Sequence, residues 1–190
     1  MKICLTCRRC AEDEDTSCAD GHQNLRQVRR GSRIISQKYR LDKELGSGAM
    51  GTVYAATHLG LDRVDAVKLL QWDSILDSIR RSQPNLLSDS EEIERRRQLT
   101  FQRFRREAKS AASIKHHNVV QVFDYDVLTD DEAYIFMELI DGQTLQEYIK
   151  PVREIPLSQV VAIARQVTAG IREAHHRKVI HRDLKPANIM

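Results

Sequence analysis

Apolar and polar residues alternate along much of the chain between residues 39 and 70. YRLDKELGSGAMGTVYAATH, residues 39–58, alternates on both sides of a glycine cluster, which predicts two strands joined by a glycine-rich turn. RVDAVKLL, residues 63–70, predicts a third strand. NVVQVFDYDV at 118–127 and AYIFMELI at 133–140 predict two further strands.

Helical periodicity appears between and after these strands. Residues 88–117 place apolar side chains three and four positions apart on one stripe, which includes Phe104 and Ala108. Residues 157–176 show the same stripe, and both segments predict helices. This order of elements predicts an α+β fold, in which a small antiparallel sheet carries one helix and a helical part follows.

Composition narrows the class of protein. The 190 residues are 41% hydrophobic and 30% charged, as in ordinary globular domains. The net charge of +3 arises from interspersed acidic and basic residues, so it does not indicate a nucleic-acid partner. No apolar run predicts a membrane segment, and the first residues lack the apolar core of a secretory signal. We therefore expect a cytoplasmic location and reduced thiols.

Three zones of different composition follow one another. Residues 1–25 contain all the cysteines, residues 26–38 are basic and predict a linker, and the regular pattern runs over residues 39–190. Cys4 and Cys7 form a C-x₂-C pair, which suits tetrahedral zinc.

Two sets of ligands are open for such a zinc site. Cys10 and Cys18 would complete a set of four thiolates, or His22 would replace one of them. Reduced cysteines without a metal are the alternative, because disulfides are rare in the cytoplasm.

The glycine cluster predicts a phosphate-binding turn. Glycine has no Cβ, so backbone amides around Gly46, Gly48 and Gly51 can approach a phosphate closely. The chain continues as a strand after Gly51, which disfavours a dinucleotide-binding fingerprint, and no Walker sequence follows. A hairpin turn without a ligand is the alternative interpretation.

Lys68 lies in the next predicted strand. Because side chains alternate, Ala66 and Lys68 share one face, where a small residue leaves room for a flat base beside a cation. A buried lysine needs an anionic partner, and Glu107 on the apolar stripe of the following helix is the candidate. An edge-strand lysine and a solvated glutamate are the alternatives.

The segment HRDLKPAN, residues 181–188, fixes five residue types within eight positions. Together with the glycine-rich hairpin, DAVK and Glu107, it resembles the protein-kinase signature set, in the same order. YIFMELIDGQTL and HRDLKPANIM are most similar to bacterial Ser/Thr kinases of the Hanks type. The resemblance covers residues 39–190. It implies an N-lobe with five antiparallel strands and one helix, followed by the first helices and the catalytic loop of a C-lobe.

The resemblance implies roles for individual residues. Asp183 is similar to the base that accepts or orients the proton of the substrate hydroxyl, and Asn188 to a magnesium ligand. Lys185 is similar to the lysine that steadies the transferring phosphate in Ser/Thr kinases, so a protein serine or threonine is the expected acceptor. Lys68 would hold the α- and β-phosphates of ATP and pair with Glu107.

ATP and Mg²⁺ are the cofactors that the resemblance implies. Backbone groups of the hinge would meet adenine, from the gatekeeper Met137 through Glu138 to Ile140. The residues expected to sandwich the base are Leu45, Val53, Ala66 and Met190. The residues expected in the phosphate turn are Gly46, Ser47, Gly48, Ala49, Met50 and Gly51.

The sequence also departs from the family pattern. These residues contain no D-F-G, activation loop or A-P-E segment, so we expect a truncated kinase domain that is silent by itself. Asp65 stands where the family usually has an apolar residue, and it is expected to point away from the face of Lys68. The long, charged connection at 71–97 predicts a solvated helical insertion.

A non-catalytic function is the alternative to a kinase. In that interpretation the chain is a nucleotide-binding or scaffold module that regulates a partner through its cysteine segment. The CADGH sequence at residues 18–22 resembles half of a zinc ribbon, like those preceding some bacterial kinases.

Overall fold

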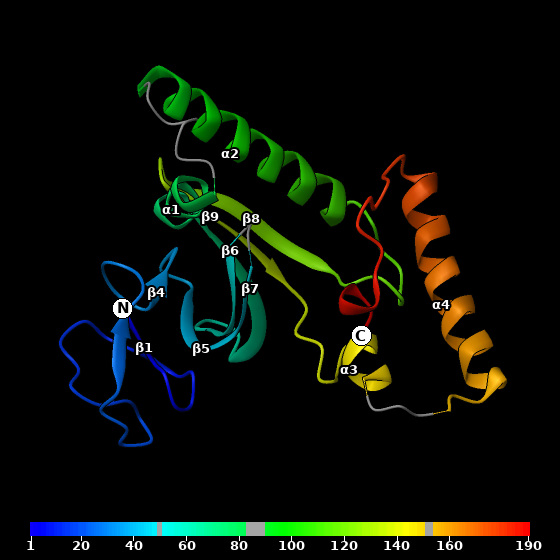
Figure 1. Ribbon diagram of the computed structural model, residues 1–190, viewed down its shortest axis with the longest axis horizontal. Helices are drawn as coiled ribbons and strands as arrows, with labels where there is room; N and C mark the ends of the chain where they lie inside the picture. Colours follow the sequence, from blue (N-terminus) through cyan, green and yellow to red (C-terminus); the bar gives the residue numbers. More distant parts are fainter. Residues whose placement is uncertain (49–50, 83–89, 151–153) are drawn as a thin grey trace. The chain divides into compact units, whose positions relative to one another are not determined.

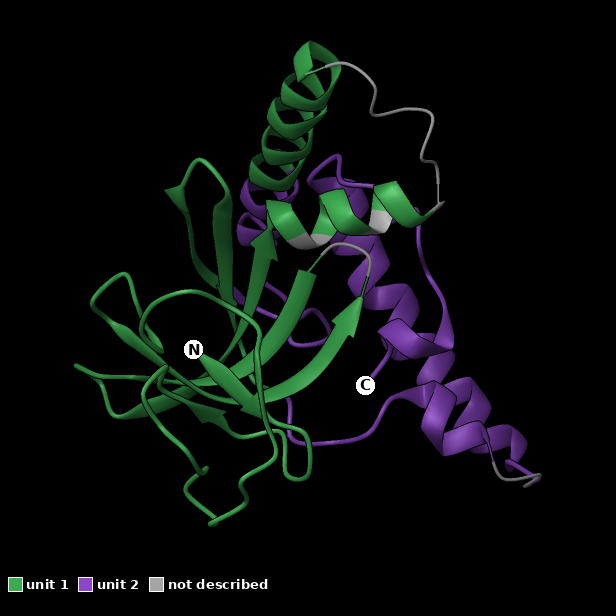
Figure 2. Cartoon of the chain, turned by 60° about the vertical axis from the view of Figure 1, so that its left-hand side comes forward, with its two compact units in different colours: residues 1–106, 123–139 green, residues 107–122, 140–190 purple. Residues whose placement is uncertain are grey.

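The computed structural model describes all residues except 49–50, 83–89 and 151–153. The chain forms two compact units, which Figure 2 colours green and purple. Unit 1 comprises residues 1–106 and 123–139, and unit 2 comprises residues 107–122 and 140–190.

Unit 1 is built on a six-stranded sheet with the order β4-β5-β6-β7-β9-β8 (Figure 1). Its strands are β4 (Ile34–Ile35), β5 (Tyr39–Gly48), β6 (Gly51–His58), β7 (Arg63–Gln71), β8 (Val122–Thr129) and β9 (Glu132–Met137). Strands β5 to β9 confirm the five predicted from alternation. The additional strand β4 lies in the stretch expected as a linker, and it pairs antiparallel with β5.

Clusters of buried hydrophobic residues lie on both faces of this sheet, so β7 is buried or half-buried at every position from Asp65 to Gln71. Val67 and Leu69 lie on one face, in a core cluster with β5, β6 and β9. Three residues of the N-terminal segment join this cluster: Met1, Ile3 and Cys10. Leu70 lies on the opposite face, in a second cluster with Trp72, Phe101, Phe104 and Ala133. The N-terminal segment therefore packs on one side of the sheet, and helical residues pack on the other.

The N-terminal segment has little regular structure of its own. Its sheet has the order β2-β1-β3 and consists of β1 (Lys2–Cys4), β2 (Cys10–Ala11) and β3 (Leu25–Gln27). An isolated antiparallel bridge between Arg9 and Lys43 connects it to β5. Strands this short bury little surface among themselves, so packing on the larger sheet is a major source of order for the segment.

Two helices follow β7 in sequence, where one packed helix and a solvated insertion were expected. They are α1 (Trp72–Ser82) and α2 (Ser90–Ala112). The expectation of a solvated insertion is wrong at its start, because the Trp72 side chain lies in the second core cluster. Burying an aromatic side chain of this size contributes roughly 1.5–3 kcal/mol, which anchors α1 to the sheet.

Asp65 lies on the same face of β7 as Val67, so it points away from Lys68 as expected. Its side chain is buried, and the guanidinium of Arg63 donates to its two carboxylate oxygens at 2.7 and 2.9 Å. The same guanidinium lies 4.3 Å from the ring centre of Phe123. An ion pair thus makes a charged residue compatible with a position where an apolar one was expected.

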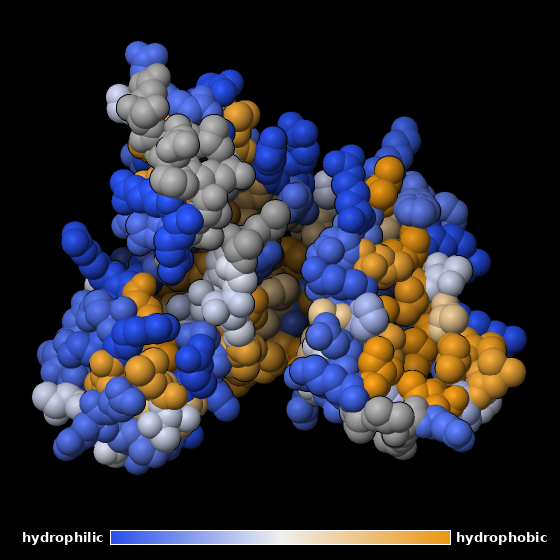
Figure 3. Space-filling view, viewed as in Figure 1, coloured by the Kyte–Doolittle hydropathy of each residue, from blue (hydrophilic) through white to orange (hydrophobic). Residues whose placement is uncertain are grey.

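Unit 2 contains α3 (Leu145–Ile149), α4 (Leu157–His176) and a 3₁₀ turn, η2 (Pro186–Asn188). The bounds of α4 match the helix predicted from periodicity. Gly170 allows α4 to approach the loop between α2 and β8, because a Cβ at this position would lie 2.9 Å from the carbonyl oxygen of Asn118 in that loop. Hydrophobic residues remain exposed on α4, and Figure 3 shows them gathered over this helix.

No helix in the described part of the chain has the length and hydropathy that a membrane crossing requires.

Candidate active site

Strand pairing gathers the predicted base-binding residues of unit 1 on one face of the sheet. Val53 pairs with Lys68 across β6 and β7, and Ala66 pairs with Met137 across β7 and β9. Directly paired residues point to the same face, and so do residues two apart in one strand. The side chains of all four residues therefore share a face, with Ala66 buried and the others half-buried.

The glycines of the hairpin have different structural roles. Gly51 has a φ of +123°, and a Cβ at this position would lie 2.2 Å from the carbonyl oxygen of Leu69. Gly51 is therefore required by the close approach of β6 to β7. At Gly46 and Gly48 a Cβ would meet no atom of the described residues within 4 Å, so the described part of the protein does not demand glycine there. Open space beside these amides fits a cradle for an external group such as phosphate.

The other residues expected around the nucleotide are only partly described. Leu45 and Ser47 are exposed beside the glycines, whereas Ala49 and Met50 lie outside the described residues. Glu138 belongs to unit 1. Ile140 and the exposed Met190 belong to unit 2. Contacts of residues from both units with the adenine base therefore stay a prediction.

Unit 2 brings the three predicted catalytic residues together. The Nζ atom of Lys185 lies 2.9 Å from Oδ2 of Asp183. The side-chain amide of Asn188 donates to the same oxygen at 3.1 Å and to the backbone carbonyl of Asp183 at 2.8 Å. Residues that are two and five positions from Asp183 thus converge on its carboxylate.

Backbone hydrogen bonds hold this loop in shape. The amide of Asp183 donates to the carbonyl of His181 at 2.8 Å, and the amide of Asn188 donates to the carbonyl of Lys185 at 2.9 Å. Between the first two residues, Arg182 adopts a φ of 61°, which costs a non-glycine residue roughly 1–2 kcal/mol. A backbone that is held in a costly conformation is typical of functional loops.

The electrostatics of the loop keep Asp183 ionised. The hydrogen bond from Lys185 is the main cause that lowers the pKa of its carboxyl group, and the bond from Asn188 adds to it. Among the described residues, no donor bonds to Oδ1 of Asn188 or to Oδ1 of Asp183. Carboxylate and amide oxygens of this kind suit Mg²⁺, so the donor set fits the ion that the resemblance implies.

Glu107 is not on the buried side of α2, which corrects the expectation from the helical stripe. Phe104 and Ala108 are buried, whereas Glu107 is exposed. The three- and four-residue spacing identified the stripe, but Glu107 falls at its edge rather than at its centre. Lys68 belongs to unit 1 and Glu107 to unit 2, so their pairing stays a prediction.

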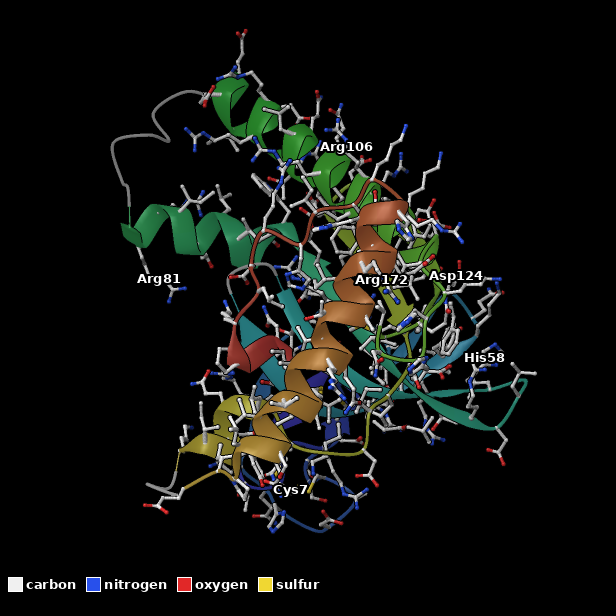
Figure 4. All side chains as sticks on the ribbon, turned by 90° about the vertical axis from the view of Figure 1, so that its right-hand side faces the viewer. Cys7, His58, Arg81, Arg106, Asp124 and Arg172 are labelled. Carbon is white, nitrogen blue, oxygen red and sulfur yellow. The ribbon has the colours of Figure 1, made fainter. Side chains whose placement is uncertain are left out.

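The cysteine segment forms a second cluster of chemical groups, in unit 1. We call it the cysteine cluster, and its members are Cys4, Cys7, Cys18 and His22. Their ligand atoms all lie within 4.8 Å of one another. Figure 4 labels Cys7 on the dark-blue N-terminal segment. Cys10 is not in this cluster, because it pairs with Ile3 across β2 and β1 and lies in the hydrophobic core. The structure therefore favours the ligand set in which His22 replaces a cysteine.

Comparison with known proteins agrees with this fold. The protein kinase domain family matches residues 39–190. Serine/threonine-protein kinase PrkC of Bacillus subtilis is 36% identical over 156 residues, which cover 82% of this chain and 21% of the relative. Serine/threonine-protein kinase pkn3 of Myxococcus xanthus is 38% identical over 160 residues, which cover 83% of this chain and 25% of the relative.

Solved structures support the same assignment. The kinase domain of Mycobacterium tuberculosis PknI superimposes with a TM-score of 0.59 at 29% identity, covering 83% of this chain and 56% of that domain. This chain thus spans a quarter or less of the curated relatives named above. The chain belongs to the protein kinase family and, within it, to the bacterial Hanks-type serine/threonine kinases.

Proposed function

We propose that this chain supplies the nucleotide-binding sheet and the catalytic loop of an ATP-dependent protein kinase acting in the cytoplasm. The reaction transfers the γ-phosphate of ATP to a serine or threonine hydroxyl of a protein substrate. One observation carries the proposal: Lys185 and Asn188 converge on the carboxylate of Asp183 at 2.9 and 3.1 Å.

Asp183 is the proposed proton acceptor. Lys185 and Asn188 both bond to its Oδ2 atom, which leaves Oδ1 to receive the hydrogen bond of the substrate hydroxyl. The lowered pKa keeps the carboxylate ionised at neutral pH. Its side chain is 64% exposed, so a polypeptide substrate can reach it.

The remaining residues neutralise and position charge. Lys185 is placed to attract the phosphoryl group beside the acceptor, and Lys68 lies on the same face of the sheet as Ala66 and Val53. Asn188 would hold Mg²⁺ through its Oδ1 atom. The ion, when bound with ATP, neutralises charge on the phosphate oxygens.

We propose a structural rather than a catalytic role for zinc in this protein. The cysteine cluster offers four protein ligands, and four ligands complete a tetrahedral site without a position for a substrate.

The proposed reaction needs an aspartate of the D-F-G type, which is not among these 190 residues. We therefore expect the polypeptide of residues 1–190 alone to transfer no phosphate. Magnesium-dependent transfer by this polypeptide would contradict that expectation. It would also require another residue to replace the missing magnesium ligand.

The test of the kinase function is Asp183→Asn in the full-length protein, with transfer of labelled γ-phosphate to a protein substrate as the readout. Loss of the base is expected to lower the rate by a factor of about 10²–10⁴. Asp130→Asn, in the exposed turn between β8 and β9, is the control and should leave the rate unchanged. An unaltered rate for Asp183→Asn would contradict the proposal.

A further inference from the structure

The cysteine cluster has the spacing of a tetrahedral metal site. The sulfur atoms of Cys7 and Cys18 lie 3.6 Å apart, and the sulfur of Cys18 lies 3.5 Å from Nδ1 of His22. Around a tetrahedral zinc ion with Zn–S of about 2.3 Å and Zn–N of about 2.0–2.1 Å, ligand atoms are separated by about 3.6–3.8 Å. These two separations are close to this geometry, and all four ligand atoms lie within 4.8 Å of one another. Both separations are far longer than a disulfide bond of about 2.05 Å.

Two tight backbone turns present the four ligands. In the first, the amide of Cys4 donates to the carbonyl of Arg9, and the amide of Arg8 donates back to the carbonyl of Cys4, both at 2.9 Å. In the second, the amide of Cys18 donates to the carbonyl of His22 at 2.9 Å, and Gly21 has a φ of +81°. The turns supply ligands in the patterns C-x₂-C and C-x₃-H.

Cys10 provides an internal comparison. It belongs to the same short segment, and all four cysteines are free thiols. Its side chain nevertheless lies in the hydrophobic core with Ile3, Leu41 and Tyr54. Hydrophobic burial accounts for Cys10, but it does not account for three other sulfurs and an imidazole that gather around one point.

We propose that the cysteine cluster binds one structural Zn²⁺ ion through four ligands: Cys4, Cys7, Cys18 and His22. Imidazole nitrogen and thiolate sulfur are the donors that zinc prefers, and a set of four closes the coordination sphere. The ion would order a segment whose strands are only two or three residues long.

The site is attached to the nucleotide-binding sheet. Arg8, which follows Cys7 in the first turn, accepts a hydrogen bond through its carbonyl oxygen from the amide of Glu44 at 2.9 Å. Its guanidinium also forms an ion pair with the carboxylate of Glu44. Glu44 directly precedes the residues expected around ATP, starting with Leu45. Metal that fixes the first turn thereby fixes the start of the glycine-rich hairpin.

The test measures the metal content of the full-length protein, purified without a polyhistidine tag under reducing conditions. We expect about one zinc ion per chain. The variants Cys7→Ser and His22→Ala should lose the bound zinc during dialysis against a chelator, whereas Cys10→Ala should retain it. A protein that contains no zinc and takes none up, or in which Cys10→Ala loses zinc while His22→Ala retains it, would overturn the assignment.

A second measurement covers variants that fail to fold. Wild-type protein stripped of metal is titrated with Co²⁺. A visible spectrum of tetrahedral, thiolate-bound cobalt that saturates at one equivalent supports the site. A weak octahedral spectrum, or no saturation, overturns it.

Hydrogen exchange tests the attachment of the zinc site to β5. Removal of zinc should accelerate exchange at the amide of Glu44, which donates to Arg8, and unchanged exchange would refute the attachment.

Discussion

The carboxylate of Glu44, on the strand that leads into the glycine-rich hairpin, is ion-paired with Arg8 of the N-terminal segment. The side chain of Glu44 is 4% exposed and that of Arg8 is 41% exposed. A buried carboxylate therefore depends on a cation that comes from outside the region of kinase homology.

Replacement of Arg8 by alanine should destabilise unit 1. The substitution leaves the carboxylate of Glu44 buried without its cation, which costs about 1–3 kcal/mol. The control is Arg9→Ala, because Arg9 pairs with Asp20 at the surface, where such pairs contribute about 0–1 kcal/mol. Urea unfolding measures the free energy of unfolding of both variants. Equal decreases in the two variants would contradict a special role of the ion pair between Arg8 and Glu44.

The two kinds of glycine in the hairpin should respond differently to alanine. Gly51→Ala places a methyl group against the carbonyl of Leu69 at a positive φ. We therefore expect the free energy of unfolding to fall by about 1–3 kcal/mol and Tm to be lower. In Gly48→Ala the methyl group meets no atom of the described residues within 4 Å, so this variant should leave Tm unchanged while raising the KM for ATP. A stable Gly51→Ala variant, or a Gly48→Ala variant with unchanged KM, would contradict these roles.

The pH dependence of the full-length enzyme should reveal the contact between Lys185 and Asp183. Lys185 lowers the pKa of the Asp183 carboxyl group, so the ionised base persists to lower pH than an ordinary aspartate. Removal of the cation in Lys185→Met raises this pKa, and the acid limb of kcat/KM should therefore move to higher pH. Lys150→Met, an exposed substitution at the end of α3, serves as the control. An acid limb that stays in place would show that Lys185 does not set the charge of Asp183.

Cys10 should resist alkylation in the folded protein. Burial raises the pKa of its thiol to about 12, so the reactive thiolate is roughly 10⁻⁴ of the population at pH 8. The rate of labelling by iodoacetamide should rise about tenfold per pH unit until the pKa is reached. Mass spectrometry of the labelled peptides measures this rate, with urea-denatured protein as the reference. Equal rates in the folded and denatured states would contradict the burial of Cys10.

The sequence predicted those parts of the molecule that depend on local pattern. Alternation located β5 to β9 because each is long enough to show a period of two, whereas the two residues of β4 show none. The grouping of the catalytic residues could also be predicted, because Asp183 and Asn188 are five positions apart and one turn brings them together. Lys68 and Glu107 are far apart in sequence, so their pairing was predicted from the position of Glu107 on the helical stripe and from the resemblance, not from local spacing.

The tertiary packing of the N-terminal segment could not be predicted from the sequence in the same way. Composition marked residues 1–25 as a cysteine-rich zone, but Ile3 and Cys10 stand in strands too short to show which face they bury. The spacing of the cysteines also left two ligand sets open, and only the backbone turn around Gly21 places His22 beside Cys18.

The packing of residues 1–38 against the sheet has a practical consequence for protein production. An expression boundary drawn at Tyr39, where homology to other kinases starts, would remove Met1, Ile3, Cys10 and Ile35 from the core cluster that also contains Leu41, Val67 and Phe136. The shortened protein would then expose a hydrophobic face of the sheet to solvent, and we expect it to aggregate.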